Sequence, residues 1–264
     1  MPIGGKLKTA IARGWSATRR LRPSRPRLTI LYYHAVPAAD AALFDRLMAW
    51  LAANANIVPA DHEGPLDPRR LNVAVTFDDA FQSVMDHALP ALRKHNIPTT
   101  IFVPTGWLGQ TPGWQMETDA DRAERVMDAA ALRSLPKELF RFGSHTVSHP
   151  RLSRLDRAGR LRELRDSRAA LEELFGGPID TLAFPYGDHD DPTLDDAKAA
   201  GYRFVYSILP EDVPPAGGGL LRGRTAVDAH DPMDLFRLKA EGAFAWLPAA
   251  IRAKRMVRGA LGRA

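Results

Sequence analysis

The segment Leu71–Asp79 reads LNVAVTFDD, a short apolar run that ends in two adjacent carboxylates and is followed directly by a helix-like pattern. In α/β proteins, ligands and catalytic groups collect at the carboxyl ends of parallel strands. Because the backbone turns where a strand ends, Asp78 and Asp79 can face one cleft, one to hold a metal ion and the other to accept protons. The alternative is that Asp79 caps a helix starting near Ala80 and that Asp78 is solvated.

A second polar cluster follows another apolar segment. Residues 139–150 read LFRFGSHTVSHP, in which His145 and His149 are four residues apart. On one helical turn, residues at this spacing face the same way, so both imidazoles can bind one ion. Ser, Thr and Pro make this stretch a poor core segment, which favours metal binding over packing. The chain has no cysteine, so any metal must be bound by His, carboxylate and water, a donor set that suits Zn²⁺.

Strand-like and helix-like segments alternate along the chain, with no internal repeat or low-complexity linker. This alternation predicts an α/β fold with a parallel sheet and helices outside it. Periodicity alone does not show whether the sheet closes into a barrel. The expected strands are 27–34, 71–77, 99–104, 139–142, 181–184, 202–208 and 220–227, and the expected helices are 40–53, 80–95, 119–135, 153–175 and 192–200.

Three short elements occur in a fixed order: TFDD at 76–79, SHTVSHP at 144–150 and AFPYG at 183–187. Together they resemble the motifs of the polysaccharide deacetylase family, also called the NodB-homology or carbohydrate esterase 4 family. The resemblance covers about residues 28–240 and implies a distorted (β/α)7 barrel in a single domain, with basic N- and C-terminal extensions.

The resemblance also implies roles for individual residues. Asp79, His145 and His149 would hold a divalent metal ion, with zinc as the first expectation and cobalt, nickel or iron as alternatives. Asp78 would be the general base, and the backbone N–H of Tyr186 would stabilise the developing oxyanion.

The sequence departs from the family pattern in two places. Ala183 stands where many members have the arginine that orients the base, so another group must position Asp78 or its role is weakened. The family's Leu-x-His motif, which supplies the general acid, has no clear match near the C-terminus. His34, which ends the first expected strand, and His230, on a late loop, are the candidates. We favour His34 because it should open onto the same rim as Asp78, although a structural role for either histidine has equal support.

The resemblance implies a metal-dependent hydrolase that removes an N-acetyl group from an amino sugar of a bacterial polysaccharide or its precursor. One alternative is removal of another small acyl group, such as formyl, from a lipid-linked amino sugar. Another is a non-catalytic glycan-binding homologue, which the two departures suggest. Trp107 and Trp114, in a loop rich in Gly and Pro, are candidates for a wall against a sugar ring, with packing as an equally supported role.

The excess positive charge lies at the two ends of the chain. Residues 6–27 contain eight Lys or Arg and residues 251–263 contain five, with no acidic residue in either range, so the body has 23 cations against 31 carboxylates. We expect a basic arm over 1–27, the deacetylase domain over 28–242 and a basic amphipathic helix over 243–264.

This charge distribution bears on partners and location. Basic helices that carry Trp and Leu can lie on an anionic membrane, which is therefore a candidate partner; a solvated arm at the front and a core-docking helix at the back are the alternative. Nucleic acid is disfavoured because no reading module is visible. The sequence shows neither a secretory signal nor an apolar run of transmembrane length. We expect a cytoplasmic location, with the inner face of the membrane as a candidate site of contact.

Overall fold

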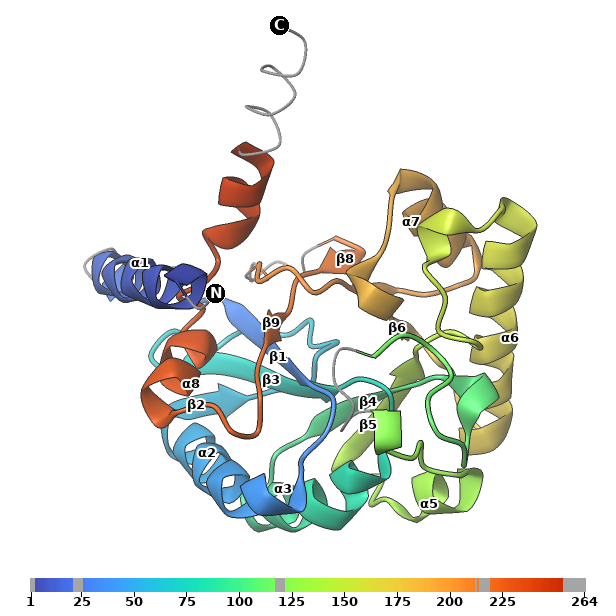
Figure 1. The fold of residues 1–264 in the computed structure, drawn as a ribbon, viewed down its shortest axis with the longest axis horizontal. Coiled ribbons are helices and arrows are strands. Elements are labelled where there is room, and N and C mark those ends of the chain that lie inside the picture. The colour runs from blue at the N-terminus through green and yellow to red at the C-terminus, as the bar shows by residue number, and fades with distance from the viewer. Residues whose placement is uncertain (1–2, 21–25, 117–121, 212, 214–218, 254–264) are drawn as a thin grey trace, which may run out of the picture.

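The computed structural model describes residues 3–20, 26–116, 122–211, 213 and 219–253. A parallel sheet with the strand order β8-β7-β6-β5-β4-β3-β1-β9 forms its centre, and β2 pairs with β3 beside this path. Helices lie around the outside of the sheet (Figure 1). The strands are β1 Leu28–Tyr33, β2 Ala55–Ile57, β3 Leu71–Phe77, β4 Thr99–Val103, β5 Phe140–Ser144, β6 Thr181–Ala183, β7 Phe204–Tyr206, β8 Leu221–Arg222 and β9 Thr225–Ala226.

The segment from β8 to β9 joins the two edges of the sheet. Its first two residues pair with β7, and Thr225 and Ala226 pair with β1. Gly223 lies between the two pairings, where a Cβ would stand 2.5 Å from the carbonyl oxygen of Leu209, so only glycine fits this close approach. One short stretch of chain thus spans the gap between the outer strands, which confirms the expected (β/α)7 barrel in a distorted form.

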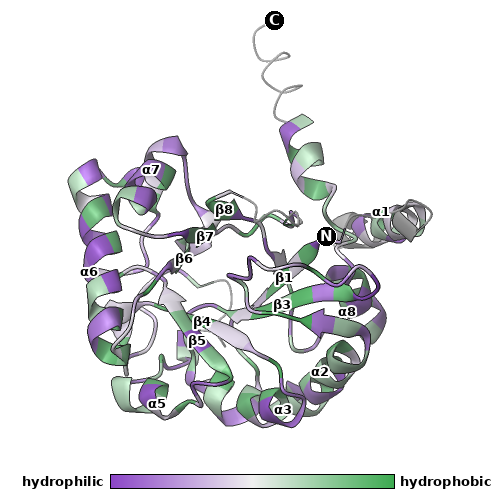
Figure 2. Ribbon diagram, turned by 180° about the vertical axis from the view of Figure 1, so that it is seen from behind, coloured by the Kyte–Doolittle hydropathy of each residue, from purple (hydrophilic) through white to green (hydrophobic). Residues whose placement is uncertain are grey.

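Capping residues in the sequence mark both ends of helix α6. Asp156 caps α6 by accepting a hydrogen bond from the N–H of Gly159, and Gly176 closes it in the left-handed conformation with φ of 73°. Hydrophilic and hydrophobic residues alternate along α6 (Figure 2). The α-helices are α1 Ile3–Arg20, α2 Ala41–Asn54, α3 Leu89–Lys94, α5 Ala129–Ser134, α6 Arg157–Phe175, α7 Asp191–Ala199 and α8 Met233–Ala240.

The expected strands are all present, although several are shorter than predicted, and β2 was not predicted. The helix expected over 80–95 is present over residues 82–94, with a π-helical turn at Val84–Ala88 before α3. The helix expected over 119–135 was wrong in extent. Residues 122–123 and α5 are helical, 124–128 are not, and 119–121 lie outside the described residues. The basic N-terminal arm contains α1. The predicted C-terminal helix is helical over 247–253, and its remainder lies outside the described residues.

The core has two main parts. One lies between the sheet and the surrounding helices and includes Phe44, Phe77 and Leu164. The other fills the barrel interior and includes Phe102 and Tyr206, whose rings lie 5.2 Å apart. Each fully buried side chain of this size contributes about 1.5–3 kcal/mol to stability through removal of apolar surface from water. The interior is therefore a packed core that holds the strand ends in place.

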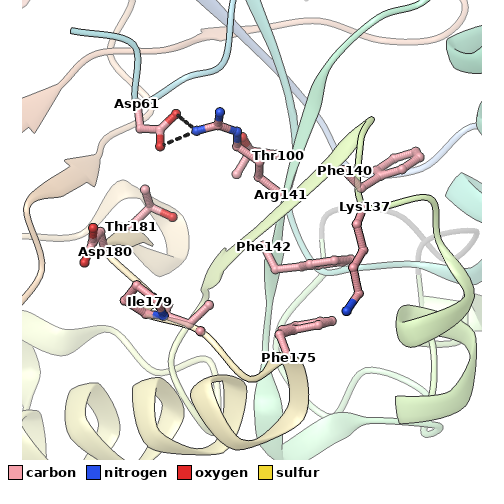
Figure 3. Close-up of a pocket in the computed structure, with 12 residues that line it drawn as sticks. Asp61, Thr100, Lys137, Phe140, Arg141, Phe142, Phe175, Ile179, Asp180 and Thr181 are labelled. Carbon is pink, nitrogen blue, oxygen red and sulfur yellow. Dashed lines mark hydrogen bonds and ion pairs between the residues drawn. The ribbon is translucent and has the colours of Figure 1, made fainter.

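A cavity of about 340 Å³ lies at the amino ends of β4, β5 and β6. Phe142 stacks on Phe175 in its wall, with ring centroids 4.0 Å apart, and Arg141 forms an ion pair with Asp61 (Figure 3). The residues with candidate chemistry follow the carboxyl ends of the strands, so this cavity lies at the other end of the barrel. Within the part of the chain that the structure describes, no helix has both the length and the apolar character needed to cross a membrane.

Candidate metal centre

The ends of β1, β3, β5 and β6 bring predicted site residues to one edge of the sheet. Asp78 and Asp79 follow β3, and His145 and His149 follow β5. β4 lies between these two strands, and β6 and β1 flank the group on either side. Because all these strands are parallel, their carboxyl ends open onto the same rim.

Asp79, His145 and His149 form a compact, buried triangle. The Oδ1 atom of Asp79 lies 3.5 Å from Nε2 of His145 and 3.4 Å from Nε2 of His149, and the two Nε2 atoms are 3.2 Å apart. The three side chains are at most 5% exposed. The alternative interpretation of Asp79 as a helix cap is wrong, since the helix begins at Gln82 and the backbone N–H of Gln82 donates to the carbonyl oxygen of Arg125.

The triangle fits a tetrahedral metal ion. Zinc bound at about 2.0–2.1 Å by such atoms requires ligand atoms that are about 3.3–3.4 Å apart, close to the three distances found here. Burial lowers the pKa of His145 to about 4 and that of His149 to about 2, so both imidazoles are neutral at pH 7, as metal ligands must be. The donor set of two imidazoles and a carboxylate suits zinc or a similar divalent ion.

The two imidazoles are oriented in different ways. Nδ1–H of His145 donates a hydrogen bond of 2.8 Å to the carbonyl oxygen of Ala183, which leaves Nε2 with its lone pair toward the centre. The ring of His149 instead stacks on Trp114, at 4.5 Å between centroids, and meets the ring of Tyr186 edge-on at 4.8 Å. Trp107 packs against Trp114 at 5.5 Å. The two tryptophans therefore pack against each other and against a candidate ligand, in agreement with the packing interpretation.

The histidines do not lie on a helix, so that part of the prediction was wrong. They converge because the chain after β5 turns through left-handed conformations, with φ of 69° at Thr146 and 60° at His149. Asp79 and Tyr186 also have positive φ, at 65° and 59°. Such conformations cost about 1–3 kcal/mol each for residues other than glycine and cluster at functional sites. Their concentration around this triangle supports a functional role.

Glu163 on α6 holds the histidine loop in this strained shape. Its Oε2 atom accepts hydrogen bonds of 2.9 Å from the backbone N–H groups of Val147 and Ser148. Its Oε1 atom accepts a bond of 2.6 Å from the hydroxyl of Ser148. Sequence reasoning missed this residue, because Glu163 looks like one more charge on the polar face of a helix.

Asp78 is buried beside the triangle and forms an ion pair with Arg224. The guanidinium donates from Nη1 to Oδ1 at 2.6 Å and from Nη2 to Oδ2 at 2.8 Å, and Arg224 is itself fully buried. Nε of Arg224 donates to the carbonyl oxygen of Ser207 at 3.1 Å, and the rings of Tyr32 and Phe102 flank the guanidinium. The chain has Ala183 where the motif would have an arginine, and Arg224, from the segment between β8 and β9, contacts Asp78 instead.

This ion pair determines the charge state of Asp78. Burial by itself raises the pKa of this carboxyl group, but the adjacent Arg224 outweighs burial and lowers the pKa to about 2. Asp78 is consequently ionised at neutral pH. It is neither solvated, as the alternative prediction held, nor part of the candidate metal triangle.

The two candidate acids lie in different places. His34 directly follows β1 and is exposed, and its ring meets the ring of Tyr32 edge-on at 5.6 Å. His230 is 69% exposed and lies 4.0 Å from Asp40. The backbone N–H of Tyr186 takes no part in the hydrogen bonds of its turn, which run from Gly187 to Phe184 and from Asp188 to Pro185.

Comparisons with known proteins find a matching family model and several relatives. The family model described as polysaccharide deacetylase matches residues 67–205, just over half of the 264-residue chain. The Bacillus subtilis protein YxkH is 25% identical over 195 residues, which span 70% of this chain and 65% of YxkH. The poly-β-1,6-N-acetyl-D-glucosamine N-deacetylase of Staphylococcus aureus is 28% identical over 151 residues, 56% of this chain. The match spans 51% of that enzyme's length.

The fold also matches a solved structure. IcaB from Ammonifex degensii superimposes with a TM-score of 0.67 at 23% sequence identity, over 83% of this chain and 98% of that one. At this level of identity, the likeness concerns the fold alone.

Proposed function

Since this chain belongs to the polysaccharide deacetylase family, we propose that it is a metal-dependent hydrolase that removes an N-acetyl group from an amino sugar of a bacterial polysaccharide or its precursor. The observation that carries this proposal is the buried triangle of Asp79, His145 and His149 next to a separate, ionised Asp78. A metal-ligand set and an adjacent general base are the two parts that amide hydrolysis most needs.

Each residue of the site has a separate role in the proposed reaction. A divalent ion held by Asp79, His145 and His149 would polarise the acyl carbonyl and activate water. Asp78 accepts a proton from the attacking water, and Arg224 keeps its carboxylate ionised and fixed in direction. The N–H of Tyr186 donates a hydrogen bond to the oxygen that becomes negatively charged. His34 donates a proton to the departing amine.

The substrate is inferred from chemistry and relatives together. The staphylococcal relative is named for poly-β-1,6-N-acetyl-D-glucosamine, and a polymer of N-acetylated amino sugars is accordingly the first substrate class that we propose. The basic amphipathic ends of the chain favour a lipid-linked amino sugar with an acetyl or formyl group as the second.

Substrate assays with the zinc-loaded protein separate these classes. The protein is incubated with oligomers of β-1,6-linked N-acetylglucosamine and with N-acetyl and N-formyl sugars on a polyprenyl phosphate. Released acetate, formate and free amine are quantified. We expect acetate from the oligomers. Formate from the lipid-linked sugar alone would favour deformylation. Binding of the oligomer without release of any acid would instead identify a glycan-binding homologue.

The general acid can be assigned with a matched pair of variants. His34→Gln is expected to lower kcat by about 10²–10⁴-fold, since protonation of the leaving amine is lost. His230→Gln should have the activity of the wild type because His230 points toward Asp40 on the surface. Metal content, measured for both variants, should be unchanged. A large loss of kcat in His230→Gln with normal kcat in His34→Gln would reverse the assignment.

A further inference from the structure

The N-terminal helix α1 contacts the body of the protein through small and polar residues. Ala12 is fully buried in a cluster with Ala243 and Phe244, just after α8. Ser16 donates a hydrogen bond of 2.6 Å to Glu241, and Arg13 forms an ion pair of 2.9 Å with Asp234. These contacts place α1 at the edge of the molecule beside α8 (Figure 1). Docking therefore leaves its large apolar side chains without a role in the core.

Those large side chains form a stripe along α1. Leu7, Ile11 and Trp15 are spaced four residues apart, so they lie on one face, and they are 62%, 41% and 41% exposed. Among the described residues, five large hydrophobic side chains are exposed, and three of them belong to this stripe. Isolated exposed hydrophobic residues need no explanation, but three in a row on one helix face indicate an interaction surface.

The positive charge near the stripe favours an anionic partner. Lys8 is exposed next to the stripe on the same helix, and residues 6–27 contain eight cations and no acidic residue. An anionic bilayer offers headgroups for the cations and an acyl boundary for the apolar stripe, and Trp favours that boundary. A second copy of the chain is a poorer partner, because an isologous contact would bring the same cations face to face.

We propose that α1 docks the protein on an anionic membrane surface, with Leu7, Ile11 and Trp15 inserted at the boundary between headgroups and acyl chains. The helix lies in the plane of the membrane and does not cross it. This surface is built from residues outside the metal centre, so membrane docking and hydrolysis are separable properties. A membrane-bound enzyme would meet lipid-linked or nascent glycan chains at the surface where they are assembled.

Vesicle binding by the full chain tests this surface. The wild type is expected to co-sediment with phosphatidylglycerol vesicles and not with phosphatidylcholine vesicles. Its binding to phosphatidylglycerol vesicles should weaken at high salt. The triple variant Leu7→Ser, Ile11→Ser and Trp15→Ser keeps every charge. We expect it to bind phosphatidylglycerol vesicles at least about tenfold more weakly. Trp15→Phe, which keeps a large apolar ring, should bind like the wild type.

The controls separate this proposal from protein damage and from the proposed function. Melting temperature and hydrolysis of a soluble oligomer should be the same in the triple variant and the wild type, since the replaced side chains are exposed. Equal binding of both proteins to phosphatidylglycerol vesicles would overturn the proposal, because charge alone would then account for binding. A wild-type dimer that the triple variant converts to monomer, without vesicle binding by either, would identify the stripe as a subunit interface and also overturn it.

Discussion

Replacement of Asp78 by Asn is expected to lower kcat by about 10²–10⁴-fold and to leave the metal content unchanged. Asn has nearly the same shape as Asp but cannot accept the proton of the attacking water. Asp78 is also outside the candidate metal triangle, so its loss should not release the ion. Hydrolysis rate and metal stoichiometry, measured on the same preparation, check both parts of this expectation.

Asp79→Asn is the matched control, because it makes the same chemical change one residue further along the chain. Asp79 is a member of the candidate triangle, so this variant should lose metal affinity as well as activity. Unchanged hydrolysis in Asp78→Asn would rule out Asp78 as the base. Loss of metal from Asp78→Asn and not from Asp79→Asn would mean that the roles of the two aspartates are exchanged.

Arg224→Met is expected to lower the free energy of unfolding by about 3–5 kcal/mol, because removal of one partner leaves a buried charge without compensation. Asp78 is only 2% exposed, and both of its carboxylate oxygens accept from Arg224. Activity should fall together with stability, since the base loses the group that fixes its direction. Denaturant unfolding at pH 7 measures the change.

A double variant distinguishes the lost charge pair from lost packing. Asp78→Asn combined with Arg224→Met contains no unpaired carboxylate, so it should be more stable than Arg224→Met alone. Arg222→Met is a further control, because Arg222 is equally buried and donates to the carbonyl oxygen of Ala60 instead of a carboxylate. A double variant that is no more stable than Arg224→Met would show that the guanidinium acts mainly by filling space among the aromatic rings.

The sequence predicted those parts of the site that depend on strand ends. TFDD and the histidine pair each follow an apolar strand, and the parallel sheet brings such ends together without further information. The prediction that one aspartate stays off the metal also came from the motif, and the structure places Asp78 against Arg224 and Asp79 against the histidines.

Arg224 could not be identified in the same way. Its contact with Asp78 spans 146 positions and exists only because the segment from β8 to β9 closes the barrel. The available signal was the presence of two arginines, Arg222 and Arg224, within the predicted strand 220–227, because a charged residue in a buried strand indicates a buried partner. Combined with the alanine at position 183, that signal would have been sufficient to propose a substitute arginine.

Two local predictions failed because tertiary contacts override local preference. Residues 125–127 were predicted to be helical, but they run in an extended form against the turn that carries Asp79. There the N–H of Gln82 donates to the carbonyl of Arg125, and that of Met127 donates to Ala80. The left-handed conformation of His149 is likewise imposed by the loop around it, since only a few per cent of residues other than glycine adopt a positive φ.

The most direct test of the metal centre is a crystal structure of the zinc-loaded protein with anomalous data at the zinc edge. We expect one strong peak per chain, within about 2.0–2.2 Å of Oδ1 of Asp79 and Nε2 of His145 and His149, with Asp78 still paired to Arg224. Zinc bound elsewhere, or a His145→Ala variant that binds zinc as tightly as the wild type, would contradict the assignment of this triangle as the metal centre.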